Sequence, residues 1–427
     1  MLKNVSRRQF IEGAGAVAAG LALVGCSSDD DEDTSEDTSE DEDTSDDTST
    51  EDDSSEEEEE TEDTESDSEE SGTIVVGVMG PYTGDVAQYG IQCRNGAEIY
   101  VADLNAAGGI NGKQIELIEE DEEGDATVAV TVYQKLVDDG VTAIIGDVTS
   151  TPCIAVAQES VADNMPCVTP SGTGDEITTY GDNFFRACFT DSSQGQMLAE
   201  FCQGEGITAV STLYNAESDY ETGINNMFVS VAEEYGITIT GEHGYPAGTT
   251  DFSSYMTSIV AEEPEAILLP NYYTEVGLQV TKARELGFEG AMMGGDGWDT
   301  TLSGGYASAE DLEGCYYTSA YFDPTSDDEA TVAFVAEFEE AYDDSPNIFG
   351  ALGHDAAMIL EVGLTAAEEA GLEPGSDDYK QTIIDTISTC SVEGLTGTIT
   401  FNGSGDPEKG SAIFTFSDGE EVLYKEI

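Results

Sequence analysis

Apolar runs alternate with amphipathic segments from residue 73 onward. "TIVVGVMGP" (73–81) is a β-branched run that ends at Gly-Pro, as buried strands do. A helical pattern covers about 88–106, and the strand-like "IELIEED" (115–121) follows it. A second amphipathic helix around 128–137 precedes the apolar strand "VTAIIGD" (141–147) and the helical "TPCIAVAQESVAD". This rhythm predicts a parallel sheet with helices on both faces.

The same rhythm resumes after a break near residue 190. Strands are expected at 207–214, 237–243, 265–271 and 290–295, alternating with helices at 218–235, 251–262 and 274–287. Two α/β units of this size predict two lobes with a cleft between them. In such sheets ligands bind beyond the carboxyl ends of the strands. Polar and aromatic residues gather at those ends, in "GPYTGDVAQYG", "GDVTSTP", "TPSGTG", "LYNAESDYETG", "PNYYTE" and "GGDGWDT".

The first 26 residues read as an export signal. Lys3, Arg7 and Arg8 precede an apolar stretch at 13–25 that is too short to span a bilayer comfortably. "SRRQFI" resembles a twin-arginine signal. "LVGC" resembles a lipobox, which would make Cys26 the lipid-bearing first residue of the mature protein. An uncleaved anchor is the alternative. We therefore expect a lipoprotein at the outer face of the cytoplasmic membrane.

Charge is extreme and unevenly distributed. Residues 27–71 are all Ser, Thr, Asp or Glu, and 27 of these 45 are acidic. The stretch has no apolar surface to bury, so 27–72 is predicted to be a disordered tether. Calcium binding is the alternative, but the stretch lacks the turn glycine of a calcium loop. Residues 72–427 still hold 63 acidic and nine basic residues, which argues against binding to nucleic acid or to an anionic membrane surface.

Several longer stretches together carry a family resemblance that covers 73–427. They are "GPYTGDVAQYGIQCRNGAEIYVADLNAAGGINGKQIEL", "VYQKLVDDGVTAIIGDVTS", "CFTDSSQGQMLAEF", "PAGTTDFSSYMTSI", "NYYTEVGLQVTKARELG" and "GTITFNGSGDPEKG". In this order they resemble the leucine/isoleucine/valine-type substrate-binding proteins of ABC transporters. The resemblance implies a two-lobed α/β type I periplasmic-binding-protein fold, with a parallel sheet in each lobe and three hinge crossovers. Lobe one would be 73–190 plus 321–402, and lobe two 191–320 plus 403–427.

The resemblance also implies a function. A monomer would capture a free amino acid, branched-chain or otherwise apolar, between its lobes and deliver it to the permease subunits of an ABC importer. The protein would need no cofactor and no metal. Lobe closure by hinge motion would enclose the ligand.

A free amino acid is a zwitterion, so its site needs donors for the carboxylate and acceptors for the ammonium. Ser150, at the start of an expected helix, would supply a hydroxyl beside unpaired backbone N–H groups. By resemblance, Thr173 supplies a second hydroxyl and Ser171 its backbone. Asp191 and Asp296 match the family's ammonium acceptors. Helix capping is the alternative for Ser150, and a capping box in "DSSQ" is the alternative for Asp191.

Aromatic residues complete the expected site. Tyr89, Tyr220 and Tyr272 match family aromatics that line the cleft, with packing in the core or at its rim as the alternative. Trp298, the single tryptophan, follows Asp296 closely and is expected either to form a wall of the side-chain pocket or to pack in the core.

Other classes of protein fit the sequence less well. An enzyme is not supported, because the two histidines are far apart and neither G-x-S-x-G nor zinc-ligand spacing is present. A ligand-sensing receptor module shares the implied fold and stays an alternative. Amides, urea and carboxylic acids are the rival ligands, but two acidic residues in the cleft favour an amine. Seven cysteines follow Cys26, so at least one is unpaired.

Overall fold

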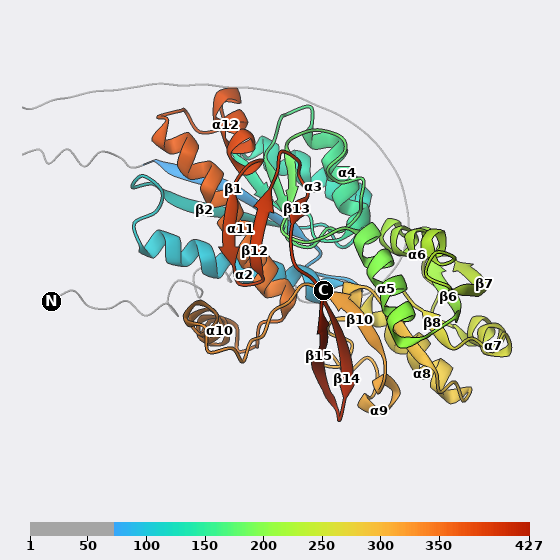
Figure 1. The fold of residues 1–427 in the computed structure, drawn as a ribbon. Helices are drawn as coiled ribbons and strands as arrows, with labels where there is room; N and C mark the ends of the chain where they lie inside the picture. The colour runs from blue at the N-terminus through green and yellow to red at the C-terminus, as the bar shows by residue number, and fades with distance from the viewer. Residues whose placement is uncertain (1–71) are drawn as a thin grey trace, which may run out of the picture. The chain divides into compact units, whose positions relative to one another are not determined.

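The computed structural model describes residues 72–427 (Figure 1). The predicted signal peptide (1–26) and all but the last residue of the predicted tether (27–72) lie outside the described residues. Within the described part, the strands form two large sheets and one small sheet.

The first sheet has five parallel strands in the order β2-β1-β3-β4-β5. Its strands are β1 (Thr73–Gly80), β2 (Gln114–Asp121), β3 (Ala143–Ile145), β4 (Cys167–Thr169) and β5 (Phe184–Arg186). The helices of this lobe are α2 (Ala87–Ala106), α3 (Ala126–Asp138), α4 (Ser150–Ser160), α10 (Glu329–Tyr342), α11 (Ile348–Glu369) and α12 (Asp377–Ile387). A small antiparallel sheet of β11 (Ser391–Gly394), β12 (Gly397–Phe401) and β13 (Pro407–Glu408) follows α12.

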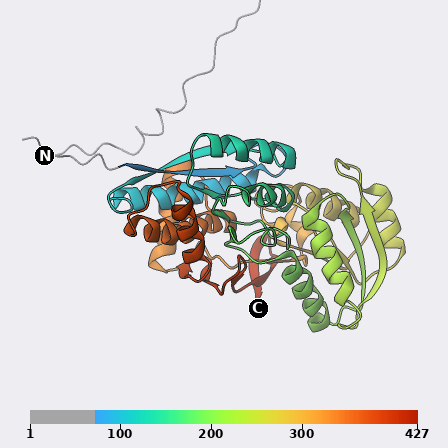
Figure 2. The ribbon, with the colours of Figure 1, turned by 90° about the horizontal axis from the view of Figure 1, so that it is seen from above.

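Strand β1 is buried on both faces, which explains its continuous apolar sequence. Ile74, Val76 and Val78 point into the core shared with α2 and α11. Val75 and Met79 point the other way, toward the core shared with α3 and α4. In the edge-on view of Figure 2, helices lie on both sides of this sheet. Because successive side chains of β1 point to opposite faces of the sheet, this one strand packs against helices on both faces.

Helices α2 and α11 cross closely because glycines lie at their contact. A Cβ on Gly96 would clash with the backbone carbonyl of Gly350, and a Cβ on Gly353 would clash with that of Cys93. Only a residue without a side chain allows such an approach. Helix α11 is long and apolar enough by composition to cross a membrane, yet most of it is buried, as in the core helix of a globular lobe.

The second large sheet has seven strands in the order β15-β14-β10-β9-β8-β6-β7. Its strands are β6 (Ala209–Asn215), β7 (Thr238–Tyr245), β8 (Ala266–Leu268), β9 (Ala291–Gly294), β10 (Tyr316–Ser319), β14 (Ala412–Ser417) and β15 (Glu420–Glu426). Its helices are α5 (Asp191–Glu205), α6 (Asp219–Val231), α7 (Ser253–Ala261), α8 (Tyr273–Glu285) and α9 (Ala309–Leu312), with the 3₁₀ turn η1 (Asp296–Trp298) after β9. The strands from β6 to β10 pair in parallel, whereas β14 and β15 are antiparallel additions. At the sheet edge, β15 exposes Val422, Leu423 and Tyr424.

The chain passes between the two large sheets three times. It leaves the first sheet after β5, returns after β10 to build α10 to β13, and leaves again before β14. The predicted α/β architecture with two parallel sheets and three crossovers is confirmed. The strands and helices expected from residue 73 to the helix α4, and again for residues 207–295, are present in the expected order. Between them the structure adds β4, β5 and α5, which were not predicted from the sequence. All seven cysteines of the described part are free, and six of them are buried.

Two carboxyl groups are buried together at the carboxyl edge of the first sheet. Glu122 and Asp147 are fully buried, and their two carboxyl groups interact with each other. Burial, and then the charge of Asp147, raises the pKa of Glu122 to about 10. Burial also raises the pKa of Asp147 to about 7. A proton on Glu122 relieves the repulsion between two buried charges.

We predict that this pair makes stability fall as pH rises. A raised carboxyl pKa in the folded state favours the protonated form. Its stabilising contribution is therefore complete below the unfolded pKa, about 4.3, and is lost as pH rises toward the folded pKa of about 10. Glu122→Gln keeps the shape and stays neutral at every pH. The melting temperature of the variant minus that of the parent should therefore be at least about 2 °C larger at pH 9 than at pH 5.

Thermal melts across this range provide the measurement. Glu116→Gln, the same substitution at an exposed position of β2, is the control. Parallel pH profiles for the parent and Glu122→Gln would show that Glu122 carries no extra proton in the fold.

Candidate functional site

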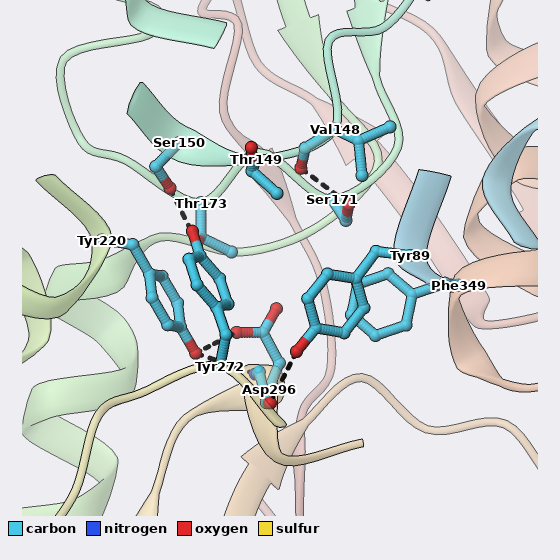
Figure 3. Close-up of a pocket in the computed structure, with 11 residues that line it drawn as sticks. Tyr89, Val148, Thr149, Ser150, Ser171, Thr173, Tyr220, Tyr272, Asp296 and Phe349 are labelled. Carbon is cyan, nitrogen blue, oxygen red and sulfur yellow. Dashed lines mark hydrogen bonds between the residues drawn. The ribbon is translucent and has the colours of Figure 1, made fainter. Parts of the chain in front are cut away.

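A small cavity lies where the carboxyl ends of the two large parallel sheets face each other (Figure 3). Its volume is about 10 Å³, which is room for about one water molecule. The lining residues are Tyr89, Val148, Thr149, Ser150, Ser171, Thr173, Tyr220, Tyr272, Asp296, Gly297 and Phe349. Seven of the nine residues predicted to bind a ligand are in this set, although they come from distant parts of the sequence.

Hydroxyl groups form the wall that the first sheet contributes. Helix α4 begins at Ser150, and Thr149 occupies the capping position without a side-chain cap bond. Ser150 Oγ lies 3.4 Å from Thr173 Oγ1 and accepts a hydrogen bond from Gly174 N at 3.0 Å. Because Ser150 is the first helical residue, its hydroxyl lies beside the N–H groups that a helix leaves unpaired at its start. This wall can donate hydrogen bonds to an anion.

Ser171 contributes to this wall differently from its neighbours. Its Oγ donates to Val148 O at 2.9 Å, which ties the segment after β4 to the segment after β3. The hydroxyl of Ser171 is therefore engaged within the loops that carry it.

Two carboxyl groups lie close to the cavity: Asp296 lies across from the hydroxyl wall, whereas Asp191 adjoins that wall, because its N–H donates to Thr173 O at 2.8 Å. Asp191 opens α5, and Asp296 lies in η1; they are 1% and 6% exposed. Burial raises the pKa of Asp191 well above its usual range. Burial also raises the pKa of Asp296 to about 6, even though hydrogen bonds from Tyr220 and Gln194 favour its charged form. The two carboxyls repel each other as well, so a nearby cation would stabilise both as charged groups.

The "DSSQ" stretch does not form a capping box. Thr190 is the N-cap residue, and its Oγ1 accepts from Ser193 N at 3.2 Å. Asp191 Oδ2 is buried and has no hydrogen-bond partner. Asp191 does not line the cavity as it stands, but Gln194 links it to Asp296, which does.

Two tyrosines stack beside Asp296. The rings of Tyr220 and Tyr272 lie 4.8 Å apart and almost parallel, at 7°. Tyr220 OH donates to Asp296 Oδ1 at 2.9 Å and accepts from Gly297 N at 2.8 Å. Figure 3 shows the Tyr272 ring between the hydroxyl wall and Asp296, where it fills much of the space between the two walls.

Tyr89 joins the two lobes across the cavity. Its hydroxyl donates to Gly297 O at 2.6 Å and accepts from Tyr273 N at 3.2 Å. Its ring contacts Phe349 at a centroid distance of 4.4 Å. Phe349 is a lining residue that the sequence reasoning did not identify. Its only signal is an aromatic in the first turn of α11, directly after the Asn347 cap.

Trp298 lies in the core of the second lobe and is not among the lining residues. Its ring is fully buried, and Nε1 donates to Leu269 O at 2.8 Å. The ring neighbours Phe416 of β14. The structure thus places Trp298 in the core, the second of the two positions expected for it, and not on the cavity wall.

The cavity is lined by hydroxyl donors and by the carboxyl of Asp296, and the carboxyl of Asp191 is buried beside it. This arrangement suits a small molecule that carries both charges. In the described part of the chain, no group of three or more His, Cys, Asp or Glu residues is placed to hold a metal ion.

Two segments of the chain match known family descriptions. Residues 73–420 match "Periplasmic binding protein", and residues 4–24 match the twin-arginine translocation pathway signal sequence. The predicted twin-arginine signal is therefore confirmed.

Similar proteins are named as amino-acid-binding proteins. Leu/Ile/Val-binding protein homolog 3 of Brucella melitensis is 27% identical over 352 residues, which cover 82% of this chain and 93% of that protein. A leucine-, isoleucine-, valine-, threonine-, and alanine-binding protein of Pseudomonas aeruginosa is 28% identical, covering 78% and 87%.

Solved structures of similar proteins have the same architecture. A leucine binding protein from Thermotoga maritima superposes with a TM-score of 0.75 at 28% identity, covering 83% of this chain and 99% of that one. A branched-chain amino acid transporter substrate binding protein from Streptococcus pneumoniae, in complex with isoleucine, gives a TM-score of 0.74 at 29% identity, with the same coverage.

We predict that Tyr89→Phe shifts the two lobes toward an open arrangement. The ring and its packing remain, but Gly297 O and Tyr273 N lose their partner, at a cost of about 1–3 kcal/mol for each buried group left unpaired. Small-angle X-ray scattering of the unliganded protein should therefore show a larger radius of gyration than in the parent.

Tyr133→Phe is the matched control, because the Tyr133 hydroxyl donates to Asp163 within one lobe. If Tyr89→Phe and Tyr133→Phe scatter alike, the Tyr89 hydroxyl does not hold the lobes together.

Proposed function

The chain belongs to the periplasmic binding protein family, and we propose that it captures a free amino acid between its two lobes for an ABC importer. The resemblance to the leucine/isoleucine/valine-type proteins is confirmed, and the relatives are named as binding proteins, not enzymes. The chain spans 93% and 87% of the two curated relatives, so the comparison concerns nearly whole proteins.

One observation carries the proposal: hydroxyl donors and the buried carboxyl of Asp296 line one cavity, and a second buried carboxyl, that of Asp191, lies next to it. Asp191 and Asp296 would accept hydrogen bonds from the ammonium group. Ser150, Thr173 and the start of α4 would donate to the carboxylate. A ligand with only one of these charges would leave one wall unsatisfied, which is costly in a buried site. An α-amino acid satisfies both walls with a single carbon between its charged groups.

The remaining lining residues favour an apolar side chain. Tyr89, Phe349 and Val148 offer ring faces and methyl groups to the cavity. Burying a leucine-sized side chain against such a surface contributes about 1.5–3 kcal/mol. Branched-chain amino acids fit these groups, in agreement with the ligands named for the relatives.

Binding requires a conformational change. A cavity of about 10 Å³ is far too small for an amino acid. We propose that the lobes open about the three crossovers and that the Tyr272 ring turns away from the space between the two walls. The lobes then close on the ligand, with lobe one at 73–190 plus 321–402 and lobe two at 191–320 plus 403–427.

We further propose that the protein is a monomer that works at the outer face of the cytoplasmic membrane. Cys26 would carry lipid, and residues 27–72 would tether the binding domain to it. Support comes from the matched twin-arginine signal, which ends at residue 24, and from "LVGC" immediately around its end. The permease subunits of the importer would receive the ligand.

We predict that the purified domain binds leucine, isoleucine or valine and that Asp296→Asn weakens this binding about ten- to hundred-fold. The substitution keeps the shape but removes a charge-assisted hydrogen bond worth roughly 1.5–3 kcal/mol. Isothermal titration calorimetry measures the affinity. Asp139→Asn, at an exposed position after α3, removes the same charge far from the cavity and should bind as the parent does.

Heat with urea or a simple amide, and none with any amino acid, would mean that the ligand class is wrong. Unchanged affinity in Asp296→Asn would show that Asp296 does not touch the ligand.

A separate prediction concerns attachment. Cys26→Ser removes the thiol that would carry the lipid in the proposed lipobox. The exported protein should therefore move from the membrane fraction to the soluble fraction. Fractionation of expressing cells, followed by immunodetection, measures this. A variant that stays in the membrane fraction would rule out lipid on Cys26 as the anchor.

A further inference from the structure

Gln194 connects the carboxyl of Asp296, which lines the cavity, to the buried carboxyl of Asp191 beside it. It lies on the first turns of α5, three residues after Asp191, and its side chain is fully buried. Gln194 Nε2 lies 3.0 Å from Asp296 Oδ1 and 3.5 Å from Asp191 Oδ1. One amide group therefore donates toward both acidic residues.

The other end of the same amide is also held. Gln194 Oε1 accepts from Asp296 N at 2.8 Å and from Thr318 Oγ1 at 2.9 Å. The Gln194 side chain thus bonds to both the backbone N–H and the carboxylate of Asp296. The hydrogen bond from Thr318 of β10 keeps the amide from flipping. Both ends of Gln194 are satisfied, so its orientation is fixed.

This contact decides which oxygen of Asp296 faces a ligand. Oδ1 accepts from Gln194 and also from Tyr220 OH. In Figure 3 the second carboxylate oxygen of Asp296 points into the cavity. The protein therefore occupies one oxygen and presents the other.

The chemistry of an amide suits this position. A lysine or arginine here would neutralise the carboxyls and take the place of a cationic ligand. A glutamate would add a third negative charge. An amide donates hydrogen bonds, which favour the charged form of each carboxylate, yet leaves their negative charge for a ligand.

We propose that Gln194 is a positioning residue that holds Asp191 and Asp296 as a charged pair with a fixed spacing, so that the site selects ligands with a protonated amine. This role rests on the proposed function, because it assumes that the pair receives an ammonium group. Gln194 itself does not line the cavity and is not expected to touch the ligand.

The test compares three variants of the binding domain with the parent. Gln194→Glu keeps the shape but replaces the donor by an oxygen. Gln194→Met keeps the length and removes both polar ends. Gln196→Glu is the matched control, since Gln196 is exposed on the same helix and bonds to Glu200.

Calorimetry with leucine from pH 5 to pH 8 is the first readout. At pH 7.5, Gln194→Met should bind at least about tenfold more weakly than the parent, and Gln196→Glu should not differ. Toward pH 5 the Glu variant should approach the parent, because a protonated glutamate donates again, whereas the Met variant should not. Equal affinities for the parent and both Gln194 variants at every pH would overturn the proposal.

The second readout needs no ligand. Carbon-13 NMR of aspartate carboxyls should show that Asp296 titrates at higher pH in Gln194→Met than in the parent, in which its pKa is about 6. A loss of packing alone would not produce this shift. If the parent binds no amino acid, the proposed function fails, but an Asp296 titration that does not respond to Gln194→Met independently overturns the role of Gln194.

Discussion

Burying two carboxyl groups in one cleft is the constraint on which the rest of this site depends. Asp191 and Asp296 are nearly inaccessible to solvent, and the charge of Asp296, in addition to burial, raises the pKa of Asp191. Desolvating charges costs several kcal/mol for each ion unless partners compensate. Tyr220 and Gln194 supply part of this compensation to Asp296, but Asp191 Oδ2 is left without a partner. A cationic group completes what the protein alone leaves unsatisfied.

The fold delivers these groups to one place from both sides. Parallel strands end at a common edge, so the segments after β3 and β4 bring hydroxyls together, and the segment after β9 brings a carboxyl to meet α5. The three crossovers set the two edges opposite each other. Tyr89 of the first lobe then bridges them, because its hydroxyl makes two hydrogen bonds to the backbone of the second lobe. Lobe closure therefore also assembles the site, because Tyr89 both lines the cavity and connects the two lobes.

Much of the fold was readable in the sequence, since strands buried on both faces must be continuously apolar, as β1 is. The start of α4 was also predictable from hydroxyl residues followed by proline. The roles assigned to the ligand-binding residues came from family resemblance, and they stay predictions.

The sequence did not reveal the contacts of Gln194, because a capping box explains "DSSQ" locally, whereas the partners of Gln194 lie 102 and 124 residues away. Phe349 had no pattern that distinguishes a cavity wall from a core position. Trp298 was ambiguous because a side chain beside a binding residue can point either into the cavity or into the core.

The last strand has a consequence for how molecules of this protein meet. Strand β15 lies at a sheet edge, where backbone donors and acceptors can pair with another chain, and its exposed valine, leucine and tyrosine would favour such pairing. Glutamates at both of its ends oppose this, because two copies of the strand repel each other. That repulsion acts over a Debye length, which shrinks from about 10 Å at 0.1 M salt to about 3 Å at 1 M. A higher ionic strength in the surroundings therefore lets two such edges approach each other more closely.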